Sequence, residues 1–200
     1  MVNRMDYSTH LPRELMAKVE AQLKPDEKIV WQGQPIGDRL ARRSVPSAIM
    51  GLFFTSFALF CLVMAVKFRP PHLAPPVDFA SLFPVIFTGL FVLIGLRMLL
   101  SPLAKRRGAL KIVYVLTDRR ALVLDASGFA LKVRSYTPAM MQDLSTVQNT
   151  DGSGDVIMES VLRSDPEGGN HTVHYGFIAV ASVKEVEAMV RKLATAVSQE

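Results

Sequence analysis

The sequence lacks the residue groupings that most catalytic and metal sites need. It has one cysteine, Cys61, in 200 residues, so it forms neither an intramolecular disulfide nor a paired-cysteine zinc site. It has no glycine-rich phosphate loop with its lysine and no H-E-x-x-H pair. His171 and His174 are three apart on a predicted strand, so they point to opposite faces. We therefore expect no enzymatic activity, no metal and no cofactor.

Charge is missing from one long stretch and nearly missing from a second. Residues 45–66 contain no charged residue, and residues 79–100 contain only Arg97. About 22 helical residues span roughly 33 Å, which suffices for the hydrocarbon core of a bilayer. A buried helix of a soluble protein would show a polar face. The pattern predicts two transmembrane helices, about 45–66 and 79–100. A signal peptide is disfavoured because some forty mostly polar residues come first.

The segment between these stretches, 67–78, is short and rich in proline, which predicts that the two helices form an antiparallel hairpin. Small side chains recur every four positions in the first stretch, and two more flank Pro84 in the second. These residues are Ser47, Gly51, Thr55, Ala80 and Thr88. Such stripes let membrane helices approach closely, although chance accounts for them equally well.

Positive charge predicts the orientation of the hairpin. The connecting segment carries only Lys67 and Arg69. The outer ends of the two stretches carry Arg39, Arg42, Arg43, Lys105, Arg106, Arg107 and Lys111. An excess of lysine and arginine marks the cytoplasmic side, so we expect a multi-pass protein of the inner membrane with both termini cytoplasmic. The net charge is +5. We expect this positive charge to contact the bilayer and its anionic lipid headgroups, and not nucleic acid.

Residues 1–44 form a predicted cytoplasmic arm. Leu11, Leu15, Val19 and Leu23 are spaced by four, which predicts an amphipathic helix. Trp31 is too far from the first apolar stretch for an aromatic-belt residue, and we expect it to pack on protein. The arm is either a plain juxtamembrane segment or a docking surface for the domain behind the hairpin.

From Gly108 onward the apolar period changes to two, which indicates strands. In residues 129–136, Leu131 and Val133 alternate with polar residues, as in a half-buried strand. Ser182 and Glu185 form a capping box that opens a final amphipathic helix, whose apolar face includes Val183, Val190 and Val197. The six predicted strands are 111–117, 120–125, 129–136, 144–149, 156–163 and 172–178. Residues 108–199 are thus predicted to fold alone, as a curved sheet or barrel plugged by the helix.

Several short motifs together resemble those of a known family. They are Trp31 with Gly33 and Pro35, Tyr114–Leu122 (YVLTDRRAL), Asp143–Val147, Gly154–Ile157 and Phe177–Ile178. With the two predicted membrane helices, the chain resembles bacterial membrane proteins that carry a pleckstrin-homology-like domain, also called a bacterial PH domain. The resemblance implies an α+β membrane protein with seven strands in two packed antiparallel sheets, a C-terminal helix and no general enzymatic activity. Since six strands are evident, the seventh is expected to be short or hidden in Pro138–Gln142.

The turn formed by Thr117, Asp118, Arg119 and Arg120 is the most specific of these motifs. One interpretation is structural, with an arginine pairing with an internal carboxylate such as Asp118 or Asp143. The other is functional, with both arginines in solvent and contacting anionic headgroups, as the resemblance implies for the first hairpin of such folds. We favour the structural interpretation, because turn motifs usually serve folding first.

These observations favour a non-enzymatic, membrane-anchored binding or scaffold protein. Its pleckstrin-homology-like domain is expected to engage an unidentified protein partner or another copy of itself. The alternative is a small oligomeric transport or channel component, or an accessory subunit of a membrane complex. Transport is disfavoured because the apolar stretches offer almost no polar side chain to line a path.

Overall fold

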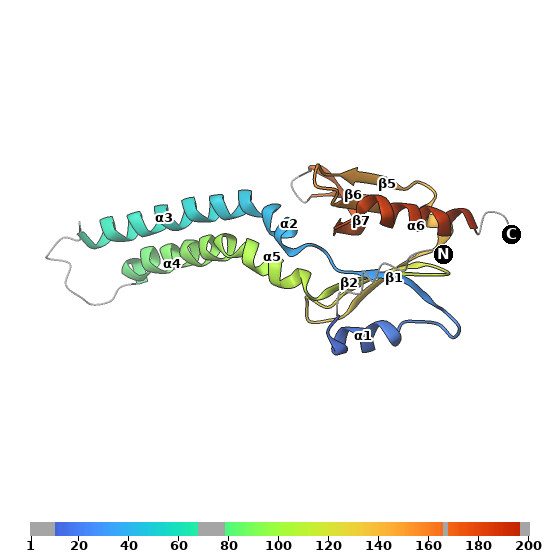
Figure 1. The fold of residues 1–200 in the computed structure, drawn as a ribbon. Coiled ribbons are helices and arrows are strands. Elements are labelled where there is room, and N and C mark those ends of the chain that lie inside the picture. Colours follow the sequence, from blue (N-terminus) through green and yellow to red (C-terminus); the bar gives the residue numbers. More distant parts are fainter. Residues whose placement is uncertain (1–10, 68–78, 166–167, 197–200) are drawn as a thin grey trace. The chain divides into compact units, whose positions relative to one another are not determined.

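The computed structural model describes residues 11–67, 79–165 and 168–196 (Figure 1). These residues form six α-helices, one 3-10 helix and seven strands in two antiparallel sheets, which confirms the α+β class. The chain divides into two compact units. Met1–Gly37 together with Arg107–Glu200 is called here the sheet unit, and Asp38–Arg106 the helix-pair unit.

The helix-pair unit contains the two apolar stretches, and both are helical. Helix α3 spans Val45–Lys67 and α4 spans Phe79–Leu99, close to the predicted bounds. A short α2 (Gly37–Arg42) precedes them, and α5 (Ser101–Ala109) follows. The predicted connector at 67–78 lies, apart from Lys67, outside the described residues.

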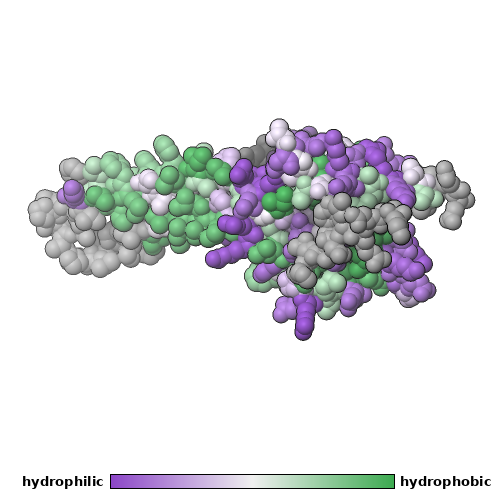
Figure 2. Space-filling model, viewed as in Figure 1, coloured by the Kyte–Doolittle hydropathy of each residue, from purple (hydrophilic) through white to green (hydrophobic). Residues whose placement is uncertain are grey.

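Helix α3 alone meets the length and hydropathy of a membrane span among the described residues. Its Val45–Met64 stretch has a mean hydropathy of 2.1 and is only 11% buried. Ile86–Leu99 of α4 meets the same test only together with Ser101–Ala109, from which it is bent by 43°. Figure 2 shows the hydrophobic residues that cover this unit. The described residues therefore contain one such helix, or two if the bent pair is one span.

Helices α3 and α4 pack so closely that a side chain on either contact glycine would collide with the other helix. A Cβ atom added to Gly51 would lie 2.6 Å from the carbonyl oxygen of Gly95, and one added to Gly95 would collide with Thr55. The rings of Phe54 and Phe91 lie 6.0 Å apart. Early residues of α3 thus meet late residues of α4, so the helices run in opposite directions.

The predicted stripe of small residues is partly right. Gly51 and Thr55 do lie at the contact, where small side chains permit close approach. On α4 the contact residue is Gly95, which the stripe of Ala80 and Thr88 missed. The side chain of Ala80 lies outside the described residues.

The sheet unit is built from two antiparallel sheets (Figure 1). The four-stranded sheet has the order β1 (Ile29–Gly33), β2 (Ile112–Thr117), β3 (Ala121–Asp125), β4 (Lys132–Tyr136). The three-stranded sheet has the order β5 (Ser145–Gln148), β6 (Gly154–Ser164), β7 (Asn170–Val180). Helix α1 (Arg13–Glu20) precedes them, the 3-10 helix η1 (Pro138–Met141) follows β4, and α6 (Val183–Ala196) follows β7.

The seventh strand comes from the N-terminal arm. Strand β1 pairs with β2 from Ile29 opposite Thr117 to Gly33 opposite Tyr114. The expectation that Pro138–Gln142 hides a strand was wrong, because Pro138–Met141 forms the 3-10 helix η1. Proline lacks the N–H that a sheet ladder needs, whereas Ile-Val-Trp is rich in strand formers. The helix-pair unit is therefore an insertion between the first two strands of one sheet.

The four-stranded sheet is covered on both faces. On one face, Tyr114 and Leu116 of β2 join a core with Phe177 and the apolar side of α6. On the other, Val113 and Val115 pack with Leu15 and Val19 of α1, together with Leu122 and Leu124 of β3. This double burial explains why β2 reads as one apolar run. The arm is thus a docked part of the sheet unit, and the docking interpretation is confirmed.

Burial follows the sequence pattern on α6 but not on β4. On α6, Val183 and Val190 are buried as predicted, together with Val186 and Leu193 of the same face, while Val197 lies outside the described residues. On β4 the prediction was wrong, since Leu131 before it and Val133 within it are each 37% exposed and Tyr136 is the buried residue. The reason is that β4 is the outer strand of its sheet.

Separating the arm from the rest should destabilise the sheet unit. Without residues 11–37, the 108–199 fragment loses β1, Trp31 and the α1 cover of Val113 and Val115. We expect it to unfold at much lower temperature than a protein in which a Gly/Ser linker of about eight residues joins 11–37 to 107–196. Thermal unfolding followed by circular dichroism compares the two. Equal melting temperatures would show that the arm is dispensable.

Candidate functional site

The Thr117–Arg120 motif forms the turn between β2 and β3. The Thr117 hydroxyl oxygen accepts hydrogen bonds from the backbone N–H groups of Arg119 and Arg120, at 3.2 and 3.0 Å. Asp118 accepts a bond from the backbone N–H of Lys28, at 3.0 Å. The motif thus closes its own turn and connects it to the N-terminal arm.

Arg120 makes a two-pronged ion pair with Glu27 of the arm. Its Nε lies 2.8 Å from Glu27 Oε1, and its Nη2 lies 2.9 Å from Oε2. The Glu27 side chain is fully buried and that of Arg120 is 17% exposed. The Thr117 hydroxyl is 2.8 Å from Glu27 Oε1, and the Gln22 carbonyl accepts a further bond from Arg120. This network favours the structural interpretation of the turn.

Two details of the sequence prediction were wrong. The carboxylate partner of Arg120 is Glu27, whereas Asp118 and Asp143 are exposed. Glu27 is 93 residues away along the chain, so no local pattern identified it. The turn also joins the second and third strands of the fold and not the first and second, because β1 comes from the arm and is connected to β2 through the helix-pair unit.

Electrostatics keeps this pair charged at neutral pH. The pKa of Glu27 is lowered from 4.5 to about 2, chiefly by the hydrogen bond from Arg120, although burial alone would raise it. Bonds from the Lys24 backbone N–H and the Thr117 hydroxyl contribute to the same lowering. The same hydrogen bond raises the pKa of Arg120. Since both groups stay ionised, the pair holds the arm against the β2–β3 turn.

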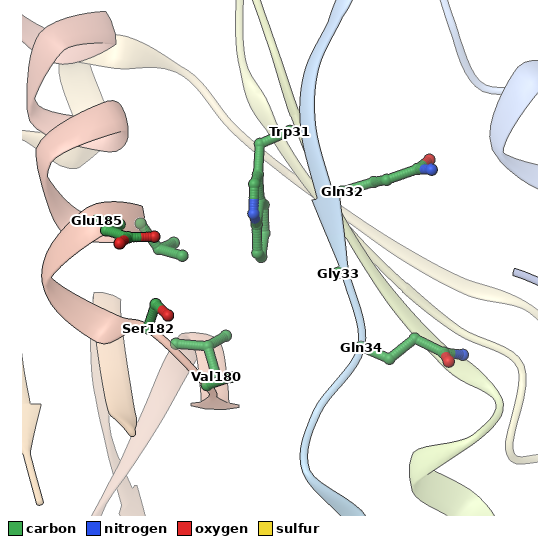
Figure 3. A pocket seen from close by; sticks show the side chains of 9 residues that line it. Trp31, Gln32, Gly33, Gln34, Val180, Ser182 and Glu185 are labelled. Atoms are coloured by element: carbon green, nitrogen blue, oxygen red, sulfur yellow. The ribbon is translucent and has the colours of Figure 1, made fainter. Parts of the chain in front are cut away.

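A small open pocket of about 80 Å³ lies between β1 and the start of α6 (Figure 3). The Trp31 ring forms one wall, packed 5.4 Å from the Phe177 ring, and points toward α6, where Ser182 and Glu185 face it. Gln32 and Gln34 also border the pocket, but their side chains extend to the other side of β1. Strand β1 is the outer strand of its sheet. An outer strand beside an aromatic wall and a carboxylate suits an extended peptide segment.

Sequence analysis missed this pocket, although it identified Trp31 as a residue that packs on protein. The pocket is assembled from the N-terminal arm and from Val180–Val186, which are far apart in the chain. The one available signal was Trp31 beside Gly33 in a β-rich segment. The ring lies where a side chain on Gly33 would be, because a Cβ there would come within 2.6 Å of it.

The seven predicted basic residues lie where the chain passes between the two units. Arg39, Arg42 and Arg43 lie in and just after α2, and Lys105, Arg106 and Arg107 lie on α5. Arg106 pairs with Asp38 at 3.0 Å, an exposed contact. Lys111 is exposed just before β2. These residues remain candidates for contact with anionic headgroups.

Among the described residues, no group of three His, Cys, Asp or Glu side chains is placed to hold a metal ion. His171 lies 3.1 Å from Asp165 and His174 lies 2.9 Å from Ser160, so the two histidines have separate partners. No family model, curated protein or solved structure matches the chain.

The two neighbouring arginines of the turn should behave differently. Arg120→Ala leaves Glu27 buried without its partner, which costs about 3 kcal/mol and lowers the melting temperature of the linked 11–37/107–196 protein by about 10 °C. Arg119→Ala, at an exposed site, should stay within about 0.5 kcal/mol of the parent. Thermal unfolding measures both. Equal losses, or none at Arg120, would contradict the structural role of the pair.

The Glu27–Arg120 ion pair should make the stability of the fold sensitive to acid. Because the folded-state pKa of Glu27 is depressed, its stabilisation is present above pH 4.5 and is lost as the pH falls toward 2. The loss amounts to about 3 kcal/mol. Glu27→Gln should lower stability at pH 7 and flatten the decline between pH 4.5 and 2. Glu20→Gln, at an exposed site on α1, is the control and should follow the parent curve in urea unfolding at each pH.

Proposed function

We propose that this chain is a non-enzymatic, membrane-anchored binding or scaffold protein. In this proposal α3 and α4 span the inner membrane as a hairpin, and the sheet unit is a pleckstrin-homology-like domain at the cytoplasmic face. The observation that carries the proposal is the apolar helix pair inserted between β1 and β2.

The exposed surface of the helix pair supports a membrane location. Large apolar side chains point outward along both helices, among them Ile49 at 63% and Phe53 at 75% exposure on α3, and Ile86 at 64% and Leu93 at 66% on α4. A protein in water does not leave so continuous an apolar surface uncovered. Lipid tails would cover it. The Gly51–Gly95 contact fits the close packing of membrane helices.

The sheet unit supports the second half of the proposal. Its four-stranded and three-stranded antiparallel sheets and its C-terminal helix are the parts that a pleckstrin-homology-like domain has. Such a domain works by binding, and the pocket between β1 and α6 is the place we assign to an extended segment of a protein partner. Glu185 at that pocket favours a partner segment with a basic residue.

The positions of the basic residues support the proposed orientation of the chain in the membrane. Both connections between the two units carry arginine or lysine, at Arg39–Arg43 and at Lys105–Lys111. The positive-inside rule then places the sheet unit, and with it both termini, in the cytoplasm.

Cysteine labelling tests the anchoring. In a Cys61→Ala background, the Lys184→Cys variant should resist a membrane-impermeant maleimide in intact spheroplasts and react after lysis, since α6 is cytoplasmic. Ala74→Cys, in the segment that links the two helices, should react in intact spheroplasts. Reaction of the Lys184→Cys variant before lysis would reverse the orientation, and release of the protein by carbonate washing would exclude a spanning hairpin.

The binding half is tested on the full chain purified in mild detergent. Proteins that co-purify with the parent are compared with those of Glu185→Arg, which alters the pocket, and of Glu20→Arg, a matched charge reversal at an exposed site on α1. A partner lost only from Glu185→Arg supports the pocket. A partner retained by both variants excludes it, and a homo-oligomer alone favours self-association.

A further inference from the structure

One end of the four-stranded sheet carries exposed apolar side chains that the proposed function leaves unused. Phe129, in the loop between β3 and β4, is fully exposed. Leu110, just before β2, is 64% exposed, and Leu131 is 37% exposed. We call Leu110, Phe129 and Leu131 the apolar tip. Phe129 is the most exposed of the large apolar side chains among the described residues.

A hydrogen bond holds the β3–β4 loop beside the start of β2, where the chain arrives from α5. The backbone N–H of Ala126 donates to the carbonyl of Lys111, at 3.0 Å. A Cβ atom on Gly108, in the last turn of α5, would lie 3.7 Å from the Cβ of Ser127. Helix α5 begins at Ser101, so Gly108 is about 11 Å of helix away from its start. The loop therefore lies beside residues that follow the end of α4 by about ten positions in the chain.

Basic side chains border the apolar tip. Lys111 follows Leu110, Lys132 follows Leu131, and both are exposed, as is Arg107 on α5. Exposed apolar side chains next to lysine and arginine are the combination that binds the interface of an anionic bilayer. The Thr117–Arg120 turn lies at the opposite end of the same strands. Leu116 pairs with Ala121 next to that turn, whereas Ile112 pairs with Asp125 next to the apolar tip.

We propose that the apolar tip is a second membrane contact, with Phe129 inserted into the headgroup region of the bilayer that α3 and α4 span. The proposal rests on the membrane anchoring proposed above. The anchor brings the apolar tip near the bilayer, since α5 connects the end of α4 to the start of β2, which lies beside the loop. The tip then fixes which end of the sheet faces the lipid and leaves the β2–β3 turn away from it.

A fluorescence-quenching experiment on the full chain tests the tip. The protein is reconstituted in nanodiscs of phosphatidylethanolamine and phosphatidylglycerol, with or without lipids that carry a nitroxide near the headgroup. A polarity-sensitive probe is attached to Gly128→Cys in a Cys61→Ala background, a site with no atom within 4 Å of an added Cβ. The matched control carries the probe at Arg119→Cys, on the opposite turn. A third protein carries it at the native Cys61, within α3.

We expect strong quenching of the probe at Gly128→Cys, about twofold or more above that at Arg119→Cys, since interfacial insertion reaches about 5–10 Å into the boundary. Adding Phe129→Ser to the Gly128→Cys protein should reduce quenching to the Arg119→Cys level. A probe at Cys61 that is quenched by lipids labelled deep in their chains shows that the anchor is inserted.

The outcomes separate the two proposals. If Cys61 is in the bilayer but Gly128→Cys is quenched no more than Arg119→Cys, the apolar tip does not touch lipid and this inference fails alone. A probe at Gly128→Cys with blue-shifted emission but no lipid quenching would place the tip against protein, such as a second copy, which also overturns it. If Cys61 is not in the bilayer, the membrane anchoring itself fails.

Discussion

The pairing of β1 with β2 is the constraint on which the rest of the structure depends. These strands are neighbours in one sheet, yet the whole helix-pair unit lies between them in the chain. A long flexible insertion would oppose the pairing through loop-closure entropy. Much of the insertion is helical instead, and α3 and α4 run in opposite directions and have similar lengths, 23 and 21 residues. The second helix therefore returns the chain to the side from which the first one left.

The Glu27–Arg120 ion pair adds specificity to a strand that is short. Strand β1 has five residues and pairs on one side only, so its backbone hydrogen bonds hold it weakly. The buried carboxylate just before it and the Trp31 ring within it give two further attachments, one to the β2–β3 turn and one to Phe177. A buried charge tolerates few alternatives to its partner, because any other register leaves it unpaired. The pair thus selects one position of the arm on the sheet.

Sequence patterns predicted the elements whose signal is local. The charge-free stretch of α3, the apolar side of α6 and the alternating strands of the second half all follow from periodicity within a few residues. The patterns failed where the partner is distant. Glu27 was not assigned to Arg120, the seventh strand was sought after β4 instead of before α3, and Gly95 was overlooked as the partner of Gly51. The pocket beside Trp31 was missed for the same reason, since its two sides come from opposite ends of the chain.

The insertion also orders the assembly of the sheet unit. Strand β1 and Glu27 are synthesised before the helix pair, whereas β2 and Arg120 are synthesised after it. Until residues 38–106 are complete, the arm has neither its neighbouring strand nor the counter-charge for Glu27. The apolar face of α1 likewise waits for Val113, Val115 and β3. The core of the sheet unit is therefore closed last, and only if the helix pair has brought both of its ends to the same side. Under the proposed anchoring, that condition is met when α3 and α4 both span the membrane, so folding of the sheet unit would depend on correct insertion of the two helices.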